Sequence, residues 1–191
     1  EENVDDNAFT NGVAKLNLTA ASQAAALLGE PATPAWNETA KKIVVLTFPD
    51  GVTREHSRYN GAKIKQADAN LLAYPLGLIT DPRQIEKDLA YYETKVPEKN
   101  TPAMTQAIFS LLYSRLGNAD KAAHFFKDAY IPNLNPPFRV IAETKGGTNP
   151  YFITGAGGVL QTVMMGFGGL AITDDGITQE KQGVLPPHWK A

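Results

Sequence analysis

Polar side chains in apolar, loop-proximal surroundings are the residues of this sequence best placed to do chemistry. Glu143 follows the apolar run FRVIA at 138–142 and precedes the KGG turn at 145–147. A carboxylate at the end of such an element is well placed to face a pocket, where it can accept hydrogen bonds from a ligand. Lys65 and Gln66, near another apolar stretch, would add donor and acceptor groups.

Each of these residues also has an ordinary structural interpretation. Glu143 is equally typical of a surface loop acid, or of a carboxylate paired with Lys145. Lys65 and Gln66 are typical of the solvated start of a helix. The residues taken singly therefore leave both interpretations open.

Several kinds of chemistry have no basis in this sequence. No nucleophile elbow or phosphate loop is present, and the glycines at 155, 157 and 158 do not follow the strand of a βαβ unit. The chain has no cysteine, and its three histidines (His56, His124 and His188) are far apart. We therefore predict neither a metal site nor an organic cofactor.

Helical patterns dominate the elements that must position the candidate residues. Apolar spacing, N-cap residues and terminal glycines predict about seven helices, and short connections predict antiparallel helical hairpins. Six are bounded at 12–28, 36–46, 82–95, 103–116, 119–130 and 154–166, and an apolar stretch lies at 65–74. We also expect a turn between extended pieces at 47–59, and a small hairpin at 171–173 and 176–178.

Composition limits the classes of partner. The 191 residues fit one compact domain, and 43% of them are hydrophobic, which is enough for a core. Eighteen basic and 20 acidic residues give a net charge of −2, with basic residues only single or paired, which argues against a nucleic-acid binder. No apolar run approaches a membrane helix in length, so we predict no membrane insertion.

Two sequons, at Asn17 and Asn37, are candidate glycosylation sites. A glycan on either would indicate passage through a secretory route. The first residue, Glu1, is not an initiator methionine, which indicates a processed or chosen start.

Five segments, taken in order, resemble glycoside hydrolase family 65 and, within it, the fungal acid trehalases. They are VDDNAFTN at 4–11, KIKQAD at 63–68, PAMT at 102–105, FRVIAE at 138–143 and FITGAGGVLQ at 152–161. The sequence GFGGL at 166–170 follows them. The resemblance covers nearly the whole chain, from Glu1 to about Trp189.

The resemblance implies an all-α fold, with residues 1–170 as the C-terminal half of an (α/α)6 barrel and 171–191 as a short β and linker segment. About seven of the twelve barrel helices are present, so an open ring would expose an apolar face to water. We therefore expect an N-terminal chain of the same precursor to complete the barrel, and a higher oligomer is compatible with this arrangement.

The resemblance also implies roles for the candidate residues. Glu143 matches the general base of the family's hydrolases, and its presence favours hydrolysis over phosphorolysis. Lys65 and Gln66 match a pair that holds glucose hydroxyls in the −1 subsite. The general acid would lie about two residues before Glu1. Glu1 and Glu2 align with variable positions, and Glu2 is kept as a weaker alternative.

The expected activity is inverting hydrolysis of α,α-trehalose to two glucose molecules by a secreted, cell-wall, periplasmic or vacuolar protein. One alternative is a related α-glucosidase acting on an α-1,2-linked glucosyl disaccharide unit. Another is a catalytically inert fragment that binds sugar or a partner, because the chain would lack the acid.

Overall fold

The computed structural model describes residues 3–96, 101–149, 151–180 and 183–190. The chain divides into two compact units, one of residues 1–62 and 68–88 and the other of residues 63–67 and 89–191. This division differs from the single compact domain expected from the length. The reason is that the helices pack in two sets, one around α1 and the other around α4.

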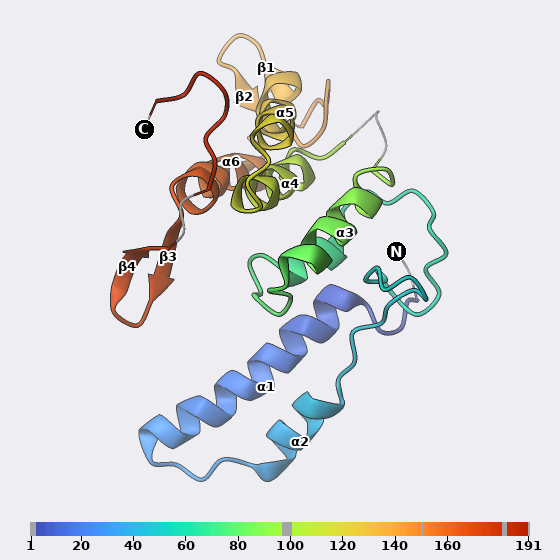
Figure 1. Cartoon of the computed structure of the whole chain (residues 1–191), viewed down its shortest axis with the longest axis vertical. Coiled ribbons are helices and arrows are strands. Elements are labelled where there is room, and N and C mark those ends of the chain that lie inside the picture. The colour runs from blue at the N-terminus through green and yellow to red at the C-terminus, as the bar shows by residue number, and fades with distance from the viewer. Residues whose placement is uncertain (1–2, 97–100, 150, 181–182, 191) are drawn as a thin grey trace. The chain divides into compact units, whose positions relative to one another are not determined.

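Helices make up most of the regular structure, and the strands found in the described residues form two short antiparallel pairs (Figure 1). The α-helices are α1 (Ala8–Leu28), α2 (Pro34–Lys42), α3 (Pro82–Tyr92), α4 (Ala103–Arg115), α5 (Ala119–Tyr130) and α6 (Ile153–Gln161). The remaining elements are η1 (Asp68–Leu72), η2 (Ile131–Asn133), β1 (Leu134–Asn135), β2 (Val140–Ile141), η3 (Thr162–Phe167), β3 (Leu170–Thr173) and β4 (Gly176–Gln179).

The predicted elements are largely confirmed, although α1 begins at Ala8 rather than at residue 12 and α3 ends at Tyr92 rather than at residue 95. Three further corrections are larger. The helix expected at 36–46 ends at Lys42, because Ile43 is extended (φ −65°, ψ 125°). The helix expected at 154–166 is α-helical only to Gln161 and continues as a π-helical turn. The apolar stretch at 65–74 forms only the short 3-10 helix η1, so the described residues hold six α-helices rather than seven.

In the first unit, the long helix α1 packs on α2 and η1 but leaves much of its apolar surface uncovered. Asn7 caps its start, and Gly29 ends it with a left-handed conformation (φ 69°). Gly12 is required for close packing, because a Cβ there would lie 2.6 Å from Leu72 Cδ2. Leu27 and Leu28 remain 88% and 77% exposed.

In the second unit, α4 is the central helix. It is apolar on all sides, and every residue from Thr105 to Ser114 is buried. The helix α5 covers one side through a face that includes Ala122 and Phe126, and α6 with η3 covers another. The elements that cover α4 stabilise it, because a helix without a polar face is stable only when it is buried.

Glycines let α6 and η3 approach α4 closely. A Cβ on Gly155 would lie 3.0 Å from Ala103 Cβ, and one on Gly158 would lie 3.1 Å from Ala107 Cβ. A Cβ on Gly166 would lie 3.2 Å from the Cα of Leu111. These glycines therefore serve helix packing, as expected for glycines at such positions.

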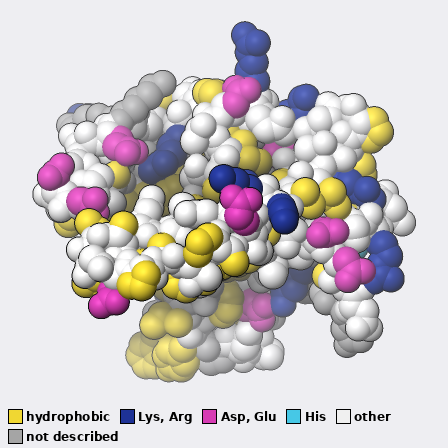
Figure 2. Space-filling view, turned by 90° about the horizontal axis from the view of Figure 1, so that it is seen from below, with side chains coloured by type: hydrophobic (Ala, Val, Ile, Leu, Met, Phe, Trp, Pro, Cys, Tyr) yellow, Lys and Arg dark blue, Asp and Glu magenta, His cyan; other side chains and the backbone are white. Residues whose placement is uncertain are grey.

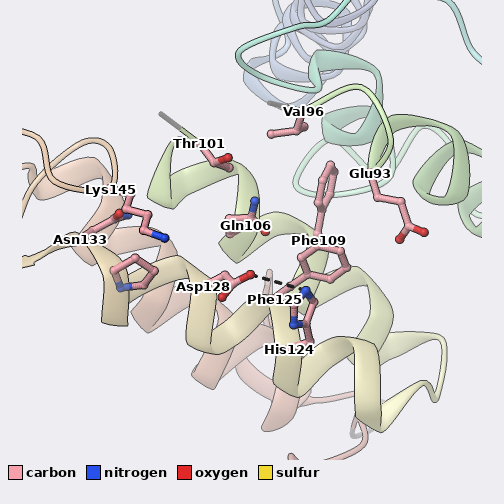
Figure 3. Close-up of a pocket in the computed structure, with 11 residues that line it drawn as sticks. Glu93, Val96, Thr101, Gln106, Phe109, His124, Phe125, Asp128, Asn133 and Lys145 are labelled. Atoms are coloured by element: carbon pink, nitrogen blue, oxygen red, sulfur yellow. Dashed lines mark ion pairs between the residues drawn. The ribbon is translucent and has the colours of Figure 1, made fainter. Parts of the chain in front are cut away.

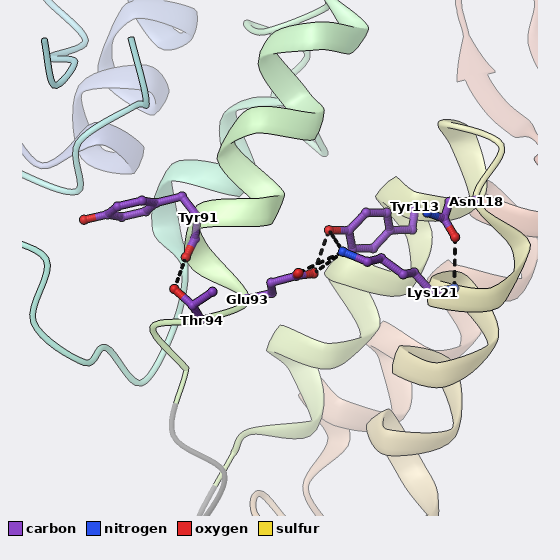
Figure 4. Close-up of polar contacts among 6 residues, drawn as sticks. All are labelled: Tyr91, Glu93, Thr94, Tyr113, Asn118 and Lys121. Atoms are coloured by element: carbon purple, nitrogen blue, oxygen red, sulfur yellow. Dashed lines mark hydrogen bonds and ion pairs between the residues drawn. The ribbon is translucent and has the colours of Figure 1, made fainter. Parts of the chain in front are cut away.

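A polar cluster joins the chain after α3 to α4 and α5 (Figure 4). Lys121 donates to both Glu93 carboxylate oxygens, at 2.8 and 2.9 Å, and the Tyr113 hydroxyl donates to Glu93 Oε2 at 2.7 Å. The Lys121 ammonium also lies 4.7 Å from the centroid of the Tyr113 ring. This partly buried ion pair holds three consecutive parts of the second unit together.

A buried carboxylate organises the turn in the first unit. Asp88 is 2% exposed and accepts hydrogen bonds from Thr53 N at 2.8 Å, Thr53 Oγ1 at 2.7 Å and Gln84 Nε2 at 2.9 Å. Burial raises the pKa of Asp88, and these hydrogen bonds oppose the rise only in part. Ionising Asp88 in the folded state is thus harder than in the unfolded chain.

We expect Asp88→Ala to lower the free energy of unfolding by about 2–4 kcal/mol, because it removes the buried carboxylate that accepts hydrogen bonds from Thr53 N and Thr53 Oγ1. Urea unfolding of the purified protein measures this loss, with Asp175→Ala in an exposed turn as the matched control. Because the pKa of Asp88 is raised in the folded state, its contribution to stability is largest below its unfolded pKa. That contribution falls as pH rises through the folded pKa. Equal stability of the two variants would contradict the role of Asp88.

The face of the molecule seen in Figure 2 shows no block of one charge among the described residues. In the view of Figure 2, basic and acidic side chains are dispersed among hydrophobic and neutral ones. None of the helices in the described part of the chain is long and apolar enough to cross a membrane.

Candidate active site

Backbone hydrogen bonds place Glu143 beside the start of α4. Glu143 follows β2, and Ala142 N donates to Asn133 O at 2.8 Å. Ala103 N, in the first turn of α4, donates to Glu143 O at 3.0 Å. The small hairpin formed by β1 and β2 therefore delivers Glu143 to a defined position. The sequence analysis did not predict this hairpin.

The structure brings Lys65 onto Glu143, although the two residues are 78 positions apart. Ile64 N donates to Lys95 O at 3.1 Å, and Thr105 Oγ1 donates to Lys65 O at 3.4 Å, which fixes the backbone of this segment. The Lys65 ammonium then donates to the carboxylate of Glu143 as an ion pair. The ion pair considered with Lys145 is thus formed with Lys65 instead.

Asn149 is a contact of Glu143 that sequence reasoning missed. Its Nδ2 donates to Glu143 Oε2 at 3.1 Å, and its Oδ1 accepts from Glu143 N at 3.3 Å. The signal available in the sequence was the glycine pair at 146 and 147, which allows the loop to turn back.

Lys65 and Asn149 set the electrostatics of Glu143. The hydrogen bond from Lys65 is the largest cause and lowers the pKa of Glu143. Desolvation opposes it as the second-largest cause, and the charge of Lys65 and the hydrogen bond from Asn149 add smaller lowering effects. The side chain of Glu143 is 26% exposed, so solvent reaches it. An ionised, solvent-accessible carboxylate held by two donors can accept a proton from water.

The other predicted site residues either make no side-chain hydrogen bond to a described residue or lie on other elements. Gln66 is exposed, and its side chain makes no hydrogen bond to a described residue. Asn17 lies within α1 beside an apolar groove, and Asn37 is exposed on α2. Glu1 and Glu2 lie outside the described residues.

A separate cavity of about 350 Å³, lined by both polar and apolar side chains, lies within the second unit (Figure 3). Its wall includes Gln106, Asn133, Lys145 and the His124–Asp128 pair, whose Nε2 and Oδ2 are 3.5 Å apart. Lys145 is only two residues after Glu143, but Glu143, Lys65 and Gln66 do not line this cavity.

Within residues 3–96, 101–149, 151–180 and 183–190, no three His, Asp or Glu side chains gather in a way that could hold a metal ion.

Comparison with known proteins identifies relatives across the whole chain. No family model matches it. It is 65% identical over 190 residues to a kojibiose hydrolase of Mucilaginibacter mallensis, and 64% identical over 189 residues to one of Flavobacterium johnsoniae. These alignments cover 100% and 99% of the chain but only 28% of each relative.

More distant matches define the breadth of the group. A periplasmic/secreted acid trehalase of Candida glabrata is 34% identical over 181 residues, covering 87% of the chain and 15% of that protein. A solved structure described as a kojibiose phosphorylase from the human microbiome matches with a TM-score of 0.70 and 16% identity. It covers 94% of this chain and 30% of that one, and at this identity it supports the mostly helical fold alone.

The sequence analysis preferred the acid trehalases. The sequence identity is higher to the two kojibiose hydrolases, at 65% and 64%, than to the acid trehalase, at 34%. The chain is therefore similar, along most or all of its length, to part of kojibiose hydrolases, acid trehalases and a protein-glucosylgalactosylhydroxylysine glucosidase, and it spans about 28% of the length of its two kojibiose hydrolase relatives.

Proposed function

We propose that this chain supplies the general base and part of the glucose-binding site of an inverting glycosidase that hydrolyses an α-1,2-linked glucosyl disaccharide such as kojibiose. The observation that carries the proposal is the 65% identity to a kojibiose hydrolase over the whole chain. The contact between Glu143 and Lys65, two residues of the predicted site, supports it from the geometry.

In this proposal Glu143 takes a proton from water, and the water oxygen attacks the anomeric carbon. The bond between that carbon and the glycosidic oxygen breaks, and a general acid protonates the leaving sugar. The donors from Lys65 and Asn149 favour the ionised form of Glu143, so the base is ready even at acidic pH. Lys65 and Gln66 would bind hydroxyls of the reacting glucose.

The general acid and the rest of the catalytic domain are proposed to lie in a longer polypeptide. The uncovered apolar surface of α1 supports this, because Val13, Leu16 and Ala20 line an apolar groove on it. Helices outside this chain would cover the groove and complete an (α/α)6 barrel. The secretory, cell-wall, periplasmic or vacuolar location stays a prediction.

Hydrolysis of α,α-trehalose is the second candidate, favoured by the 34% identity to an acid trehalase. Phosphorolysis has less support, because the match to a phosphorylase structure bears on the fold alone. A fragment that binds sugar without cleaving it remains the alternative for the isolated chain.

A substrate panel on the complete polypeptide tests the proposal. We expect kcat/KM for kojibiose to exceed that for trehalose by at least about tenfold, because a pocket contacting the second sugar discriminates linkages on this scale. Proton NMR should show β-glucose as the first product from the non-reducing unit, and phosphate should not change the rate. A preference for trehalose or a requirement for phosphate would overturn the proposed activity. The same panel on the isolated chain should show no hydrolysis.

A further inference from the structure

The loop after Glu143 returns an amide side chain to the carboxylate. Asn149 donates through Nδ2 to Glu143 Oε2 at 3.1 Å and accepts through Oδ1 from Glu143 N at 3.3 Å. One side chain therefore contacts the backbone and the carboxylate of the same residue. Two contacts of this kind fix the relative position of the groups more firmly than either alone.

Glycines shape this loop so that Asn149 can reach Glu143. Gly146 has a positive φ of 67°, and Gly147 N donates to Thr144 O at 2.9 Å. A Cβ on Gly147 would lie 2.9 Å from Thr144 O and 3.1 Å from Asn149 Oδ1, so a larger residue would push the loop apart. Asn135 Nδ2 donates to Gly147 O at 2.9 Å and anchors the turn from the β1 side.

We propose that Asn149 is a positioning residue that fixes the orientation of the Glu143 carboxylate for water activation. The inference rests on the proposed function, in which Glu143 is the general base. The torsion that rotates a glutamate carboxylate is broad when the group is free. Lys65 donates to one oxygen and Asn149 to the other, so this rotation is restricted while further lone pairs stay open to water.

Lys65 and Asn149 contact the Glu143 carboxylate separately, so the effect of Asn149 on the pKa of Glu143 can be measured by itself. Among the described residues, Lys65 is the charged side chain in contact with Glu143, and it comes from the 63–67 segment. Lys145 is on the same loop as Glu143 but lines the separate cavity shown in Figure 3. Loss of the Asn149 donor should therefore raise the pKa of Glu143 without changing its ion pair.

The test compares Asn149→Ala and Asn149→Asp in the complete polypeptide with Thr148→Ala, an exposed neighbour on the same loop. We expect Asn149→Ala to lower kcat by about tenfold with KM changed less than about twofold. In a plot of kcat/KM against pH, activity falls on the acidic side as Glu143 becomes protonated. This acid limb of the profile should move to higher pH. Thr148→Ala should match the wild type in both respects.

The Asn149→Asp variant distinguishes a role of Asn149 in orienting the Glu143 carboxylate from a role in holding the loop together. Aspartate is nearly isosteric and can still accept from Glu143 N, but it cannot donate to Glu143 when ionised and it adds a repelling charge. We therefore expect it to be at least as slow as Asn149→Ala, with thermal stability near the wild type. Wild-type kcat and an unmoved acid limb in Asn149→Asp would overturn the inference. If Glu143→Gln were fully active, the proposed base itself would fail, which is a distinguishable result.

Discussion

Replacing Glu143 by glutamine is expected to lower kcat of the complete enzyme by about 10²–10⁴-fold, the range that general base catalysis contributes. Glutamine has nearly the same shape, but its single amide oxygen can accept from only one of the two donors, because Lys65 and Asn149 bond different oxygens of the Glu143 carboxylate. It cannot take the proton of water. Thermal stability should change little, because the residue is partly exposed.

The exposed Glu86 on α3 offers a matched control, since Glu86→Gln makes the same chemical change at a residue of the first unit, which does not contain Glu143. A second variant, Glu143→Ala, leaves room for a small anion in place of the activated water. Azide needs no proton removed, so it should restore turnover and form a β-glucosyl azide by inversion. Wild-type turnover in a folded Glu143→Gln protein would show that another group activates the water.

The helical part of the fold was predictable because its signals are local. Asn118 accepts from Lys121 N at 3.1 Å, and Asp81 accepts from Arg83 N at 3.0 Å, as expected for the starts of α5 and α3. Gly29 ends α1 through its left-handed conformation. A cap depends on residues within one turn, so the sequence alone locates it.

The parts that were missed depend on distant contacts. The two-residue strands β1 and β2 are too short to show an alternating pattern, and they are held by pairing with each other and by the bond from Ala142 N to Asn133 O. The extension of α6 as a π-helical turn accompanies close packing on Leu111, which no local propensity shows.

The candidate site was predictable only in part for the same reason. Glu143, Lys65 and Gln66 were selected, but the local pattern offered Lys145 as the nearest cation. The fold instead brings Lys65 across 78 positions. Asn149 escaped notice because an asparagine before a proline is typical of a turn, and its contact depends on the shape that Gly146 and Gly147 give the loop.

The ion pair between Lys65 and Glu143 has a consequence for pH dependence. The Lys65 hydrogen bond is the largest cause of the lowered pKa of Glu143. A depressed carboxylate pKa keeps the base ionised until pH falls through that value, so activity persists into acidic solution. The same ammonium is proposed to hold a glucose hydroxyl. One substitution should therefore affect both the pH profile and the affinity for substrate.

We expect Lys65→Met to lower kcat/KM for kojibiose by about 10–100-fold at the pH optimum, as for loss of a charged hydrogen-bond donor. The acid limb of the profile should move to higher pH, because the pKa of Glu143 rises when the ammonium is removed. Lys65→Arg should restore the acid limb more fully than the affinity, since it keeps the charge but not the shape of the donor. Lys145→Met removes the nearest cation in sequence and should leave the limb unmoved. If the acid limb moved in Lys145→Met but not in Lys65→Met, then Lys145 rather than Lys65 would set the pKa of Glu143 in solution.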